Sequence, residues 1–389
     1  MVWQSPRTGD IFVATGAILS QLGVGWCFFR DAKPRLRPWV FRVARFLLQG
    51  IWCLTAIGVA LELFTDRFRA SHLPPVIRST TVGVEIVWSF VSGLALLAWL
   101  LWRPVVERHS TDRRLALKAA VGTCIAAPFV AVGYGTFIER SAFQVSEIDL
   151  PVPGLHPDLA GLRVAQISDL HVSQYLSIRE CARVIDMTNE LRPQLTLMTG
   201  DLISEAGDPL DDVLRQLSRL RAEAGVLGCL GNHEMYAECE EYTAREGRRL
   251  GVDFLRKEAR QLRWGKGVLN IAGVDFQRFA KRDGYLDGTS HLIVPGASNI
   301  LLSHNPDVFP TAVRTGFDAV ISGHTHGGQV TVEIVSKTLN FARFFTPYVR
   351  GMYRLDGRTC YVNNGIGTIG MPVRLGAPPE ITLMRLRRA

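Results

Sequence analysis

The sequence predicts two parts of different fold class, an α-helical membrane region and an α/β domain that follows it. Four long apolar stretches precede residue 140. After residue 160, short apolar runs alternate with amphipathic stretches of helical period. The length of 389 residues also exceeds that of one average domain, so a chain of two parts is expected.

Each apolar stretch is close to the ~20 residues with which a helix crosses a bilayer core. Short charged loops separate the stretches, which fits membrane spans better than the buried helices of a soluble core. We expect about four spans, near residues 11–29, 46–64, 82–102 and 117–138. Residues 1–140 would then form the transmembrane region.

The distribution of charge predicts how this region is oriented. Residues 1–139 carry 15 Lys and Arg against 8 Asp and Glu, whereas residues 140–389 carry 29 against 28. The basic residues concentrate in the first and third loops, which predicts that these loops are cytoplasmic. The rest of this multi-pass cell-membrane protein would then be extracytoplasmic. Nucleic acid is not expected as a partner, because the second part has no excess positive charge.

Arg113 and Arg114 precede the fourth apolar stretch and allow two interpretations. They are similar to a twin-arginine export signal, which is read by a receptor. They also fit ordinary charges on the cytoplasmic side of a span. Both interpretations send the following domain outward.

After a linker over residues 141–160, the domain over residues 161–389 alternates strands and helices. Strands are predicted at Arg163–Ser168, Leu195–Thr199, Val226–Leu230, Val268–Val274, Asn299–Ser303, Ala319–Ser322, Thr359–Val362 and Ile381–Leu386. Amphipathic helices are predicted at Ser177–Leu191 and Pro209–Glu223. In α/β folds of this kind, functional groups gather in the loops at strand ends.

Polar side chains directly follow five successive predicted strands. These residues are Asp169 and His171, then Asp201, then Asn232, His233 and Glu234, then His304, and finally His324 and His326. Each motif alone has an ordinary explanation as a turn or a helix cap. However, five of the seven histidines in residues 140–389 lie in these turns. Independent turns would not collect histidines in this way.

This combination of ligand types indicates a pair of divalent metal ions. Imidazole suits Zn, Fe and Mn, and carboxylate or amide oxygen suits the harder ions. The seven cysteines include no C-x-x-C pair, which argues against a structural zinc site. Two metals at ~3.5–4 Å need a bridging carboxylate and act together on a phosphoryl group.

In this order, D-x-H, G-D, G-N-H-[DE], a single H and G-H-x-H resemble the signature of the calcineurin-like metallophosphoesterase superfamily. The blocks extend over residues 169–328. Residues 365–381 are similar to the branch that includes YkuE and YaeI, and the apolar front is similar to transmembrane proteins with such a domain. The resemblance implies a two-sheet α/β/β/α sandwich with two divalent metals, Mn, Fe or Zn, at its rim.

The resemblance also implies a role for each residue. Asp169, His171 and His326 would hold the first metal, Asn232, His304 and His324 the second, and Asp201 would bridge them together with a hydroxide that attacks phosphorus. His233 would protonate the leaving oxygen or steady the transition state, Asn232 would also contact the phosphate, and Glu234 would orient His233. Ser204 stands where many members have an acidic residue, which puts the tuning of His233 in doubt.

The expected function is that of a membrane-anchored phosphoesterase that hydrolyses phosphomonoesters or phosphodiesters, on an envelope or lipid-linked substrate. The alternative is a catalytically weak membrane sensor or binding protein that uses the same metal site. All seven ligand positions are present, which favours the enzyme. Arg350 and Arg374 could contact a phosphate, and the Phe341–Tyr348 stretch could approach a lipid surface or belong to the core. The metal, the natural substrate and the oligomeric state are left open.

Overall fold

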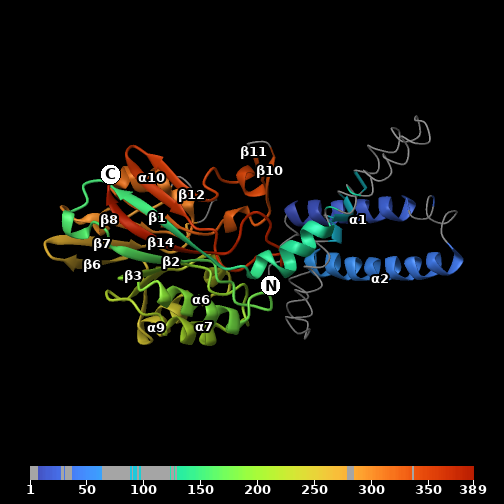
Figure 1. Ribbon diagram of the computed structural model, residues 1–389, viewed down its shortest axis with the longest axis horizontal. Helices are drawn as coiled ribbons and strands as arrows, with labels where there is room; N and C mark the ends of the chain where they lie inside the picture. The colour runs from blue at the N-terminus through green and yellow to red at the C-terminus, as the bar shows by residue number, and fades with distance from the viewer. Residues whose placement is uncertain are drawn as a thin grey trace. The chain divides into compact units, whose positions relative to one another are not determined.

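The computed structural model describes residues 8–27, 30, 37–63, 88–89, 91–93, 96–97, 123, 127, 129–277, 284–334 and 337–389 (Figure 1). The chain divides into two compact units. The first lies within residues 1–134 and 370–372, and the second within residues 135–369 and 373–389.

In the first unit, helix α1 (Thr8–Cys27) contacts helix α2 (Pro38–Leu63). Among the described residues, one helix is long and apolar enough to cross a membrane, over Pro38–Ile57. The side chains of Trp39 and Phe46 on this helix are 60% and 75% exposed, as expected of a helix that faces lipid. Its apolar surface is therefore available to a bilayer.

The predicted spans meet this unit only in part. Those near residues 11–29 and 46–64 coincide with α1 and α2, and α2 begins earlier than expected because proline is well tolerated at the first helical position. The span near residues 82–102 falls largely outside the described residues, and of the span near residues 117–138 the structure describes residues 123, 127 and 129–138, with helix over 129–137. Four spans therefore stay a prediction.

Two six-stranded mixed sheets form the centre of the second unit. The first sheet has the order β1 (Gln144–Val152), β14 (Glu380–Arg388), β2 (Arg163–Ile167), β3 (Leu195–Thr199), β4 (Val226–Cys229) and β5 (Val252–Phe254). The second has the order β12 (Gly351–Leu355), β13 (Arg358–Val362), β9 (Ala319–Ser322), β8 (Ser298–Leu302), β7 (Gly267–Gly273) and β6 (Glu258–Trp264). A hairpin of β10 (Thr331–Ile334) and β11 (Lys337–Asn340) stands apart from both.

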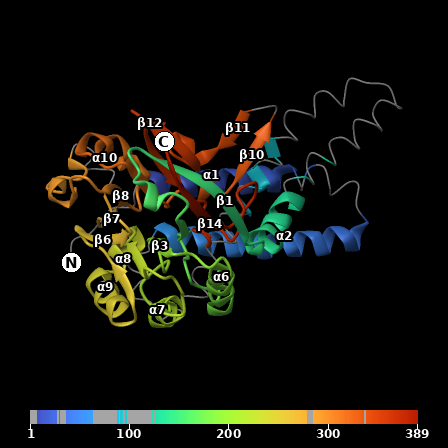
Figure 2. The ribbon, with the colours of Figure 1, turned by 60° about the vertical axis from the view of Figure 1, so that its left-hand side comes forward.

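Helices cover the outer faces of the two sheets (Figure 2). On the first sheet lie α6 (Ile178–Glu190), α7 (Leu210–Leu217) and α9 (Glu240–Arg249), and α10 (Phe309–Thr315) packs on the second. An apolar core also lies between the two sheets and includes Leu197 of β3 and Ile300 of β8. The unit is thus a helix–sheet–sheet–helix sandwich, which is the architecture that the resemblance implies.

Local sequence explains why the principal elements form. All five residues of β3 are buried, because the strand is covered on both faces, and such strands read as continuous apolar runs. Helix α6 begins with a capping box in which Ser177 accepts from the backbone of Glu180 and the Glu180 carboxylate accepts from that of Ser177. The eight predicted strands and two predicted helices are confirmed within a few residues, except that α7 ends at Leu217.

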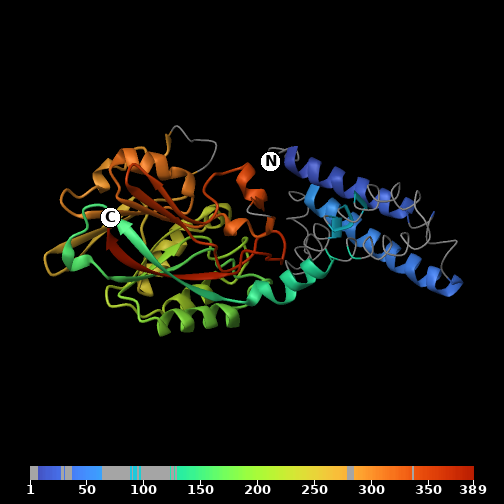
Figure 3. The ribbon, with the colours of Figure 1, turned by 45° about the horizontal axis from the view of Figure 1, so that its top comes forward.

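The prediction of a linker over residues 141–160 is wrong for Gln144–Val152. These residues form β1, which runs parallel to β14 along its whole length (Figure 3). The strand carries alternating charged residues such as Glu147 and Asp149 on its exposed side, which hides it from a search for apolar runs. The sheet therefore begins before residue 161.

Strands β2, β3 and β4 are mutually parallel, as are β7, β8 and β9. The carboxyl ends of parallel strands meet at one edge of a sheet. The five motifs follow β2, β3, β4, β8 and β9, so both sheets deliver their polar turns to a shared rim.

Candidate metal centre

The structure gathers the predicted ligands into two adjoining groups. Asp169, His171 and His326 form one group, and Asp201, His304 and His324 form the other, with the candidate ligand atoms of each group within 4.8 Å of one another. Apart from His324, these side chains are almost completely buried. Each group thus joins side chains from segments that are far apart in sequence.

Asp201 lies between the two groups. Its Oδ2 is 3.4 Å from Nε2 of His171 and 3.0 Å from Nε2 of His304. Asp201 Oδ1 accepts a hydrogen bond of 2.9 Å from the backbone amide of His233. One carboxylate oxygen is thereby held by the protein, and the other faces both groups, as a bridging ligand would require.

Within each group, imidazole nitrogens face each other. Nε2 of His326 is 3.1 Å from Nε2 of His171, and Nδ1 of His324 is 3.1 Å from Nε2 of His304. Imidazole nitrogens that converge in this way suit a shared cation once any proton between them has been lost.

Asn232, the first residue of helix α8 (Asn232–Tyr236), offers a candidate oxygen ligand just after β4. Its side chain is 5% exposed, and its Oδ1 has no hydrogen-bond partner among the described residues. A buried amide oxygen without a partner is costly, and a metal ion would satisfy it. The nitrogen and oxygen donors and this oxygen together fit two divalent metals.

The backbone at the site adopts an uncommon conformation. Asp169, His171, Asp201, His324 and His326 all have positive φ, between 46° and 76°. Non-glycine residues occupy this region only when the surrounding structure imposes it, at a cost of about 1–3 kcal/mol each. The backbone conformation that directs these side chains toward one another therefore lowers the stability of the fold.

Two glycines allow the strand ends to approach closely. A Cβ atom on Gly231 would lie 2.1 Å from Oδ1 of Asp201, and one on Gly323 would lie 1.9 Å from Oγ of Ser168 and 2.2 Å from Oδ2 of Asp169. No side chain fits at these distances, so the G-N-H and G-H-x-H motifs need glycine for steric reasons.

Protein oxygens orient the imidazoles of His304 and His171. The carbonyl oxygen of Thr199 lies 2.6 Å from Nδ1 of His304, which leaves Nε2 of that ring for Asp201. Oγ of Ser204 lies 3.3 Å from Nδ1 of His171. The serine that replaces an acidic residue of many relatives thus contacts a candidate metal ligand.

His304 and Asp201 form a charged pair in the protein without metal. Burial alone favours the neutral imidazole of His304, but Asp201 and Asp169 raise its pKa to about 10. For Asp201, burial raises the pKa, yet the nearby His304 and His233 outweigh it and hold the pKa well below the ordinary value. Metal at this position would have to displace the His304 proton.

The imidazoles of His233, His324 and His326 are neutral near pH 7. Burial lowers the pKa of His324 to about 3 and that of His233 to about 4, and it holds the pKa of His326 well below the ordinary value. Neutral imidazole is the form that binds metals. His324 and His326 could therefore coordinate a metal without losing a proton.

His233 lies beside the metal ligands and has its own fixed orientation. Its ring meets that of His171 edge-on, with centroids 4.6 Å apart, and its Nδ1 is 2.5 Å from the carbonyl oxygen of Ser204. The contact with Ser204 involves Nδ1 and not Nε2. Tyr236, which is 61% exposed, packs edge-on against His233 on the open side.

The expectation that Glu234 orients the imidazole of His233 is wrong. The buried Glu234 carboxylate accepts hydrogen bonds from the backbone amides of Asp201, Leu202 and Gly231. It thus joins the loop after β3 to the loop after β4, and the His233 ring is held by Ser204 instead. No residue type in the sequence marks this carbonyl, so the sequence carried no signal for it.

Arg374 does not point toward a phosphate site. It is completely buried, and its guanidinium donates to the carbonyl oxygens of Gly367 (3.0 Å), Asn364 (2.9 Å) and Ala377 (2.9 Å). Nη2 also lies 3.4 Å from Nδ1 of His326. The side chain therefore supports the segments behind the first group of ligands.

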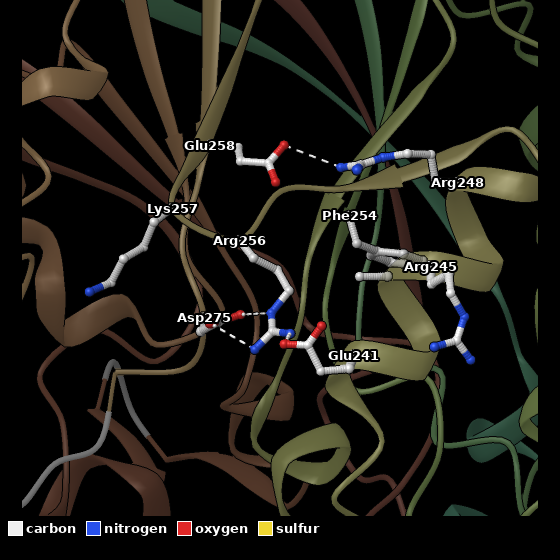
Figure 4. Close-up of a pocket in the computed structure, with 9 residues that line it drawn as sticks. Glu241, Arg245, Arg248, Phe254, Arg256, Lys257, Glu258 and Asp275 are labelled. Carbon is white, nitrogen blue, oxygen red and sulfur yellow. Dashed lines mark hydrogen bonds and ion pairs between the residues drawn. The ribbon is translucent and has the colours of Figure 1, made fainter.

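A separate cavity of about 510 Å³ lies between α9 and β6 (Figure 4). Its charges are largely paired, since Arg256 contacts Asp275 and Glu241, and Arg248 contacts Glu258. The cavity shares no residue with the ligand groups. However, Asp275 directly precedes Phe276, whose ring lies 5.4 Å from that of His324 and 6.0 Å from that of His304.

The site defines a class of protein, the metal-dependent phosphoesterases, and comparison with known proteins identifies the family. The sequence model of the calcineurin-like phosphoesterase family matches residues 162–328. A transmembrane protein with metallophosphoesterase domain from Bos taurus is 28% identical over 309 residues, which cover 76% of this chain and 68% of the relative. The metallophosphoesterase YkuE of Bacillus subtilis is 28% identical over 282 residues, which cover 71% and 98%.

A third relative, the UDP-2,3-diacylglucosamine pyrophosphatase LpxG of Chlamydia trachomatis, is 26% identical over 328 residues. The matched region covers 70% of this chain and 97% of the relative. This chain belongs to the calcineurin-like metallophosphoesterase family and is a phosphoester hydrolase. The family and the YkuE-like resemblance predicted from the motifs are confirmed.

Proposed function

We propose that this chain is a membrane-anchored, two-metal phosphoesterase whose active site is the rim formed by Asp169, Asp201 and their histidine partners. One observation carries the proposal above all. Oδ2 of Asp201 faces His171 of one ligand group and His304 of the other. A carboxylate in this position is what a dinuclear centre requires and a mononuclear centre does not.

The ligand assignment follows the two groups. Asp169, His171 and His326 would hold one ion, and His304, His324 and Asn232 the other, with Asp201 shared. When bound, two divalent cations supply a Lewis acid for the phosphoryl oxygens and lower the pKa of water at the site.

His233 would then act on the substrate rather than on a metal. Its Nδ1 is engaged by Ser204, so its Nε2 is the atom that would give a proton to the leaving oxygen or contact the phosphoryl group. Burial lowers the pKa of this imidazole to about 4, and an anionic phosphoester beside it would oppose that effect. His233 therefore gains its proton most readily when substrate is present.

The substrate class is proposed from the membrane part and from the relatives. The Pro38–Ile57 helix can hold the chain in a membrane, and LpxG is named for a nucleotide-linked substrate with two acyl groups. We therefore favour a lipid-linked or envelope-derived phosphoester, with the second unit outside the cytoplasm as the basic loops predict.

The decisive experiment measures turnover by the full chain, purified in detergent and loaded with Mn, Fe or Zn, on aryl phosphomonoesters and phosphodiesters. We expect turnover with at least one metal and its loss in Asp201→Asn, while the surface variant Asp212→Asn keeps it. Turnover with none of the three metals would overturn the enzymatic proposal in favour of a sensor.

A further inference from the structure

Two aromatic side chains project into solvent close to the metal centre. Phe344, at the end of the short helix η8 (Phe341–Phe344), is 84% exposed, and Phe345 is 64% exposed. Arg343 beside them is also exposed. We call these three residues the aromatic tip. Large apolar side chains that are this exposed and adjacent to one another are typical of a contact surface.

The base of the aromatic tip is fastened to the G-H-x-H turn from both sides. Before the tip, Nδ2 of Asn340 donates to the carbonyl oxygen of Gly327 (2.8 Å). After it, Oγ1 of Thr325 donates to the carbonyl oxygen of Val349 (2.5 Å). Thr325 stands between the two ligands His324 and His326, so the tip is held in a fixed relation to the metal centre.

A second exposed apolar residue is attached to the same turn. The side-chain amide of Gln329 donates to the carbonyl oxygen of Ile369 (3.0 Å) and accepts from its backbone amide (2.9 Å). Ile369 is 37% exposed. The G-H-x-H turn and the residue after it are thus hydrogen-bonded to two separate segments, and each of these segments exposes apolar side chains.

We infer that the aromatic tip enters the lipid–water interface and that the metal centre acts on phosphoesters of lipids in that interface. Aromatic rings with a neighbouring arginine match the interface, where rings settle at headgroup depth and arginine meets lipid phosphates. The same chain also has the Pro38–Ile57 helix, which is long and apolar enough to cross a membrane, and for this reason we favour a bilayer as the apolar partner. This inference rests on the proposed function and narrows its substrate class.

The consequence concerns where the substrate is bound. A lipid whose phosphoester lies at headgroup depth could reach the metals without leaving the bilayer, whereas a soluble ester would gain nothing from the tip. The tip should therefore lower the KM for lipid substrates and leave soluble substrates unaffected.

The first test compares two substrates with the metal-loaded full chain in vesicles of phosphatidylethanolamine and phosphatidylglycerol. One is soluble bis(p-nitrophenyl) phosphate, and the other is a diacylglycerol p-nitrophenyl phosphate within the vesicle. In the double variant Phe344→Ser/Phe345→Ser, we expect kcat/KM to fall about tenfold on the lipid ester and less than about twofold on the soluble ester. The matched control Met352→Ser/Leu355→Ser, at side chains 37% and 36% exposed, should change neither.

The second test does not depend on turnover. Vesicles with a photoreactive acyl chain are irradiated, and the chain is digested with trypsin, which releases Phe344–Arg350 as one peptide. We expect label on this peptide, in metal-loaded and metal-free protein alike, and little on the neighbouring Gly351–Arg354.

The outcomes separate the two proposals. Label on Phe344–Arg350 without turnover of either ester would support the lipid contact and overturn the proposed function. Turnover of the soluble ester without label, or an equal loss on both esters in the double variant, would overturn the inference.

Discussion

Oδ2 of Asp201 lies 3.0 Å from Nε2 of His304, and both side chains are buried at the rim where the two sheets meet. The pair is charged without metal, because each residue stabilises the ionised form of the other. The same two residues are proposed to ligate a metal. The behaviour of this pair therefore reports on metal binding as well as on catalysis.

Asp201→Asn should remove metal together with activity. Asparagine keeps the shape of the side chain but loses the charge that faces both groups of ligands. We expect the bound metal, measured by mass spectrometry, to fall from about two ions to below one per chain, and turnover to fall roughly 100-fold or more. Full metal content in this variant would contradict the bridging position of Asp201.

Metal binding near pH 8 should release the proton of His304, in addition to any proton lost by metal-bound water. His304 has a pKa raised to about 10 by Asp201 and Asp169 against the effect of burial, so it is protonated at this pH and must lose its proton to coordinate. His324 and His326 are already neutral and release none. Apparent affinity should therefore fall about tenfold per unit as the pH is lowered from 9 to 7.

Calorimetric titration of the metal-free chain in two buffers of different ionisation enthalpy counts these protons. The surface variant His291→Gln should release the same number as the natural chain. A count of zero would show that His304 is neutral before metal arrives.

His233→Ala should abolish most turnover while the metal content stays near two. The imidazole contacts Ser204 and the neighbouring rings, and no predicted ligand position is lost. We expect kcat on an aryl phosphodiester to fall about 10²–10⁴-fold. His156→Ala, at a histidine 41% exposed, is the matched control. Unchanged turnover would remove His233 from the proposed mechanism.

Gly231→Ala should damage the metal centre for steric reasons alone. Its new Cβ would meet Oδ1 of Asp201 at 2.1 Å, whereas φ at Gly231 is −101° and suits alanine. Metal content and turnover should both fall. Gly225→Ala, where φ is +88° and the space is open, tests strain without a clash and should cost about 1 kcal/mol of unfolding free energy with metal retained. Equal effects of the two changes would contradict the steric explanation.

Arg374→Met should lower the free energy of unfolding of the second unit by roughly 3 kcal/mol or more, because buried carbonyl oxygens of Gly367, Asn364 and Ala377 lose their donor. Burial lowers the pKa of this guanidinium to about 10, so it is charged at neutral pH. The change in the free energy of unfolding is measured by urea titration, with the loss of turnover as the signal of unfolding. The exposed Arg354→Met should leave the midpoint unaltered, and an equal midpoint for Arg374→Met would contradict its supporting role.

Much of the site could be predicted because particular residue types, which the sequence shows directly, supply its chemistry. Histidine, aspartate and asparagine directly after apolar strands mark the candidate ligands, and the structure brings the histidines and aspartates together. The carbonyl oxygens that orient His304 and His233 belong to Thr199 and Ser204, and a backbone atom has no residue signature. The positive φ angles of the ligands are likewise properties of the folded chain.

Strands could be predicted from the sequence where both of their faces are buried, as in β3. They could not be predicted where one face is exposed to solvent. Strand β1 alternates charged and apolar residues, and short β5 offers only three residues, so neither stands out as an apolar run. The direction of Arg374 also escaped prediction, because an arginine in a glycine- and proline-rich segment is as typical of a surface as of a buried support.

The position of β14 has a consequence for the order in which the protein can fold during synthesis. This strand lies between β1 and β2 in the first sheet, yet it follows both of them by more than 200 residues in the chain. Until it emerges from the ribosome, β1 has no neighbour in the sheet and β2 keeps an open edge. In this sheet, the segments after β2, β3 and β4, which carry candidate metal ligands, are made before the strand that completes the sheet. During synthesis, the first sheet therefore has unpaired strand edges that are open to aggregation until β14 has been made.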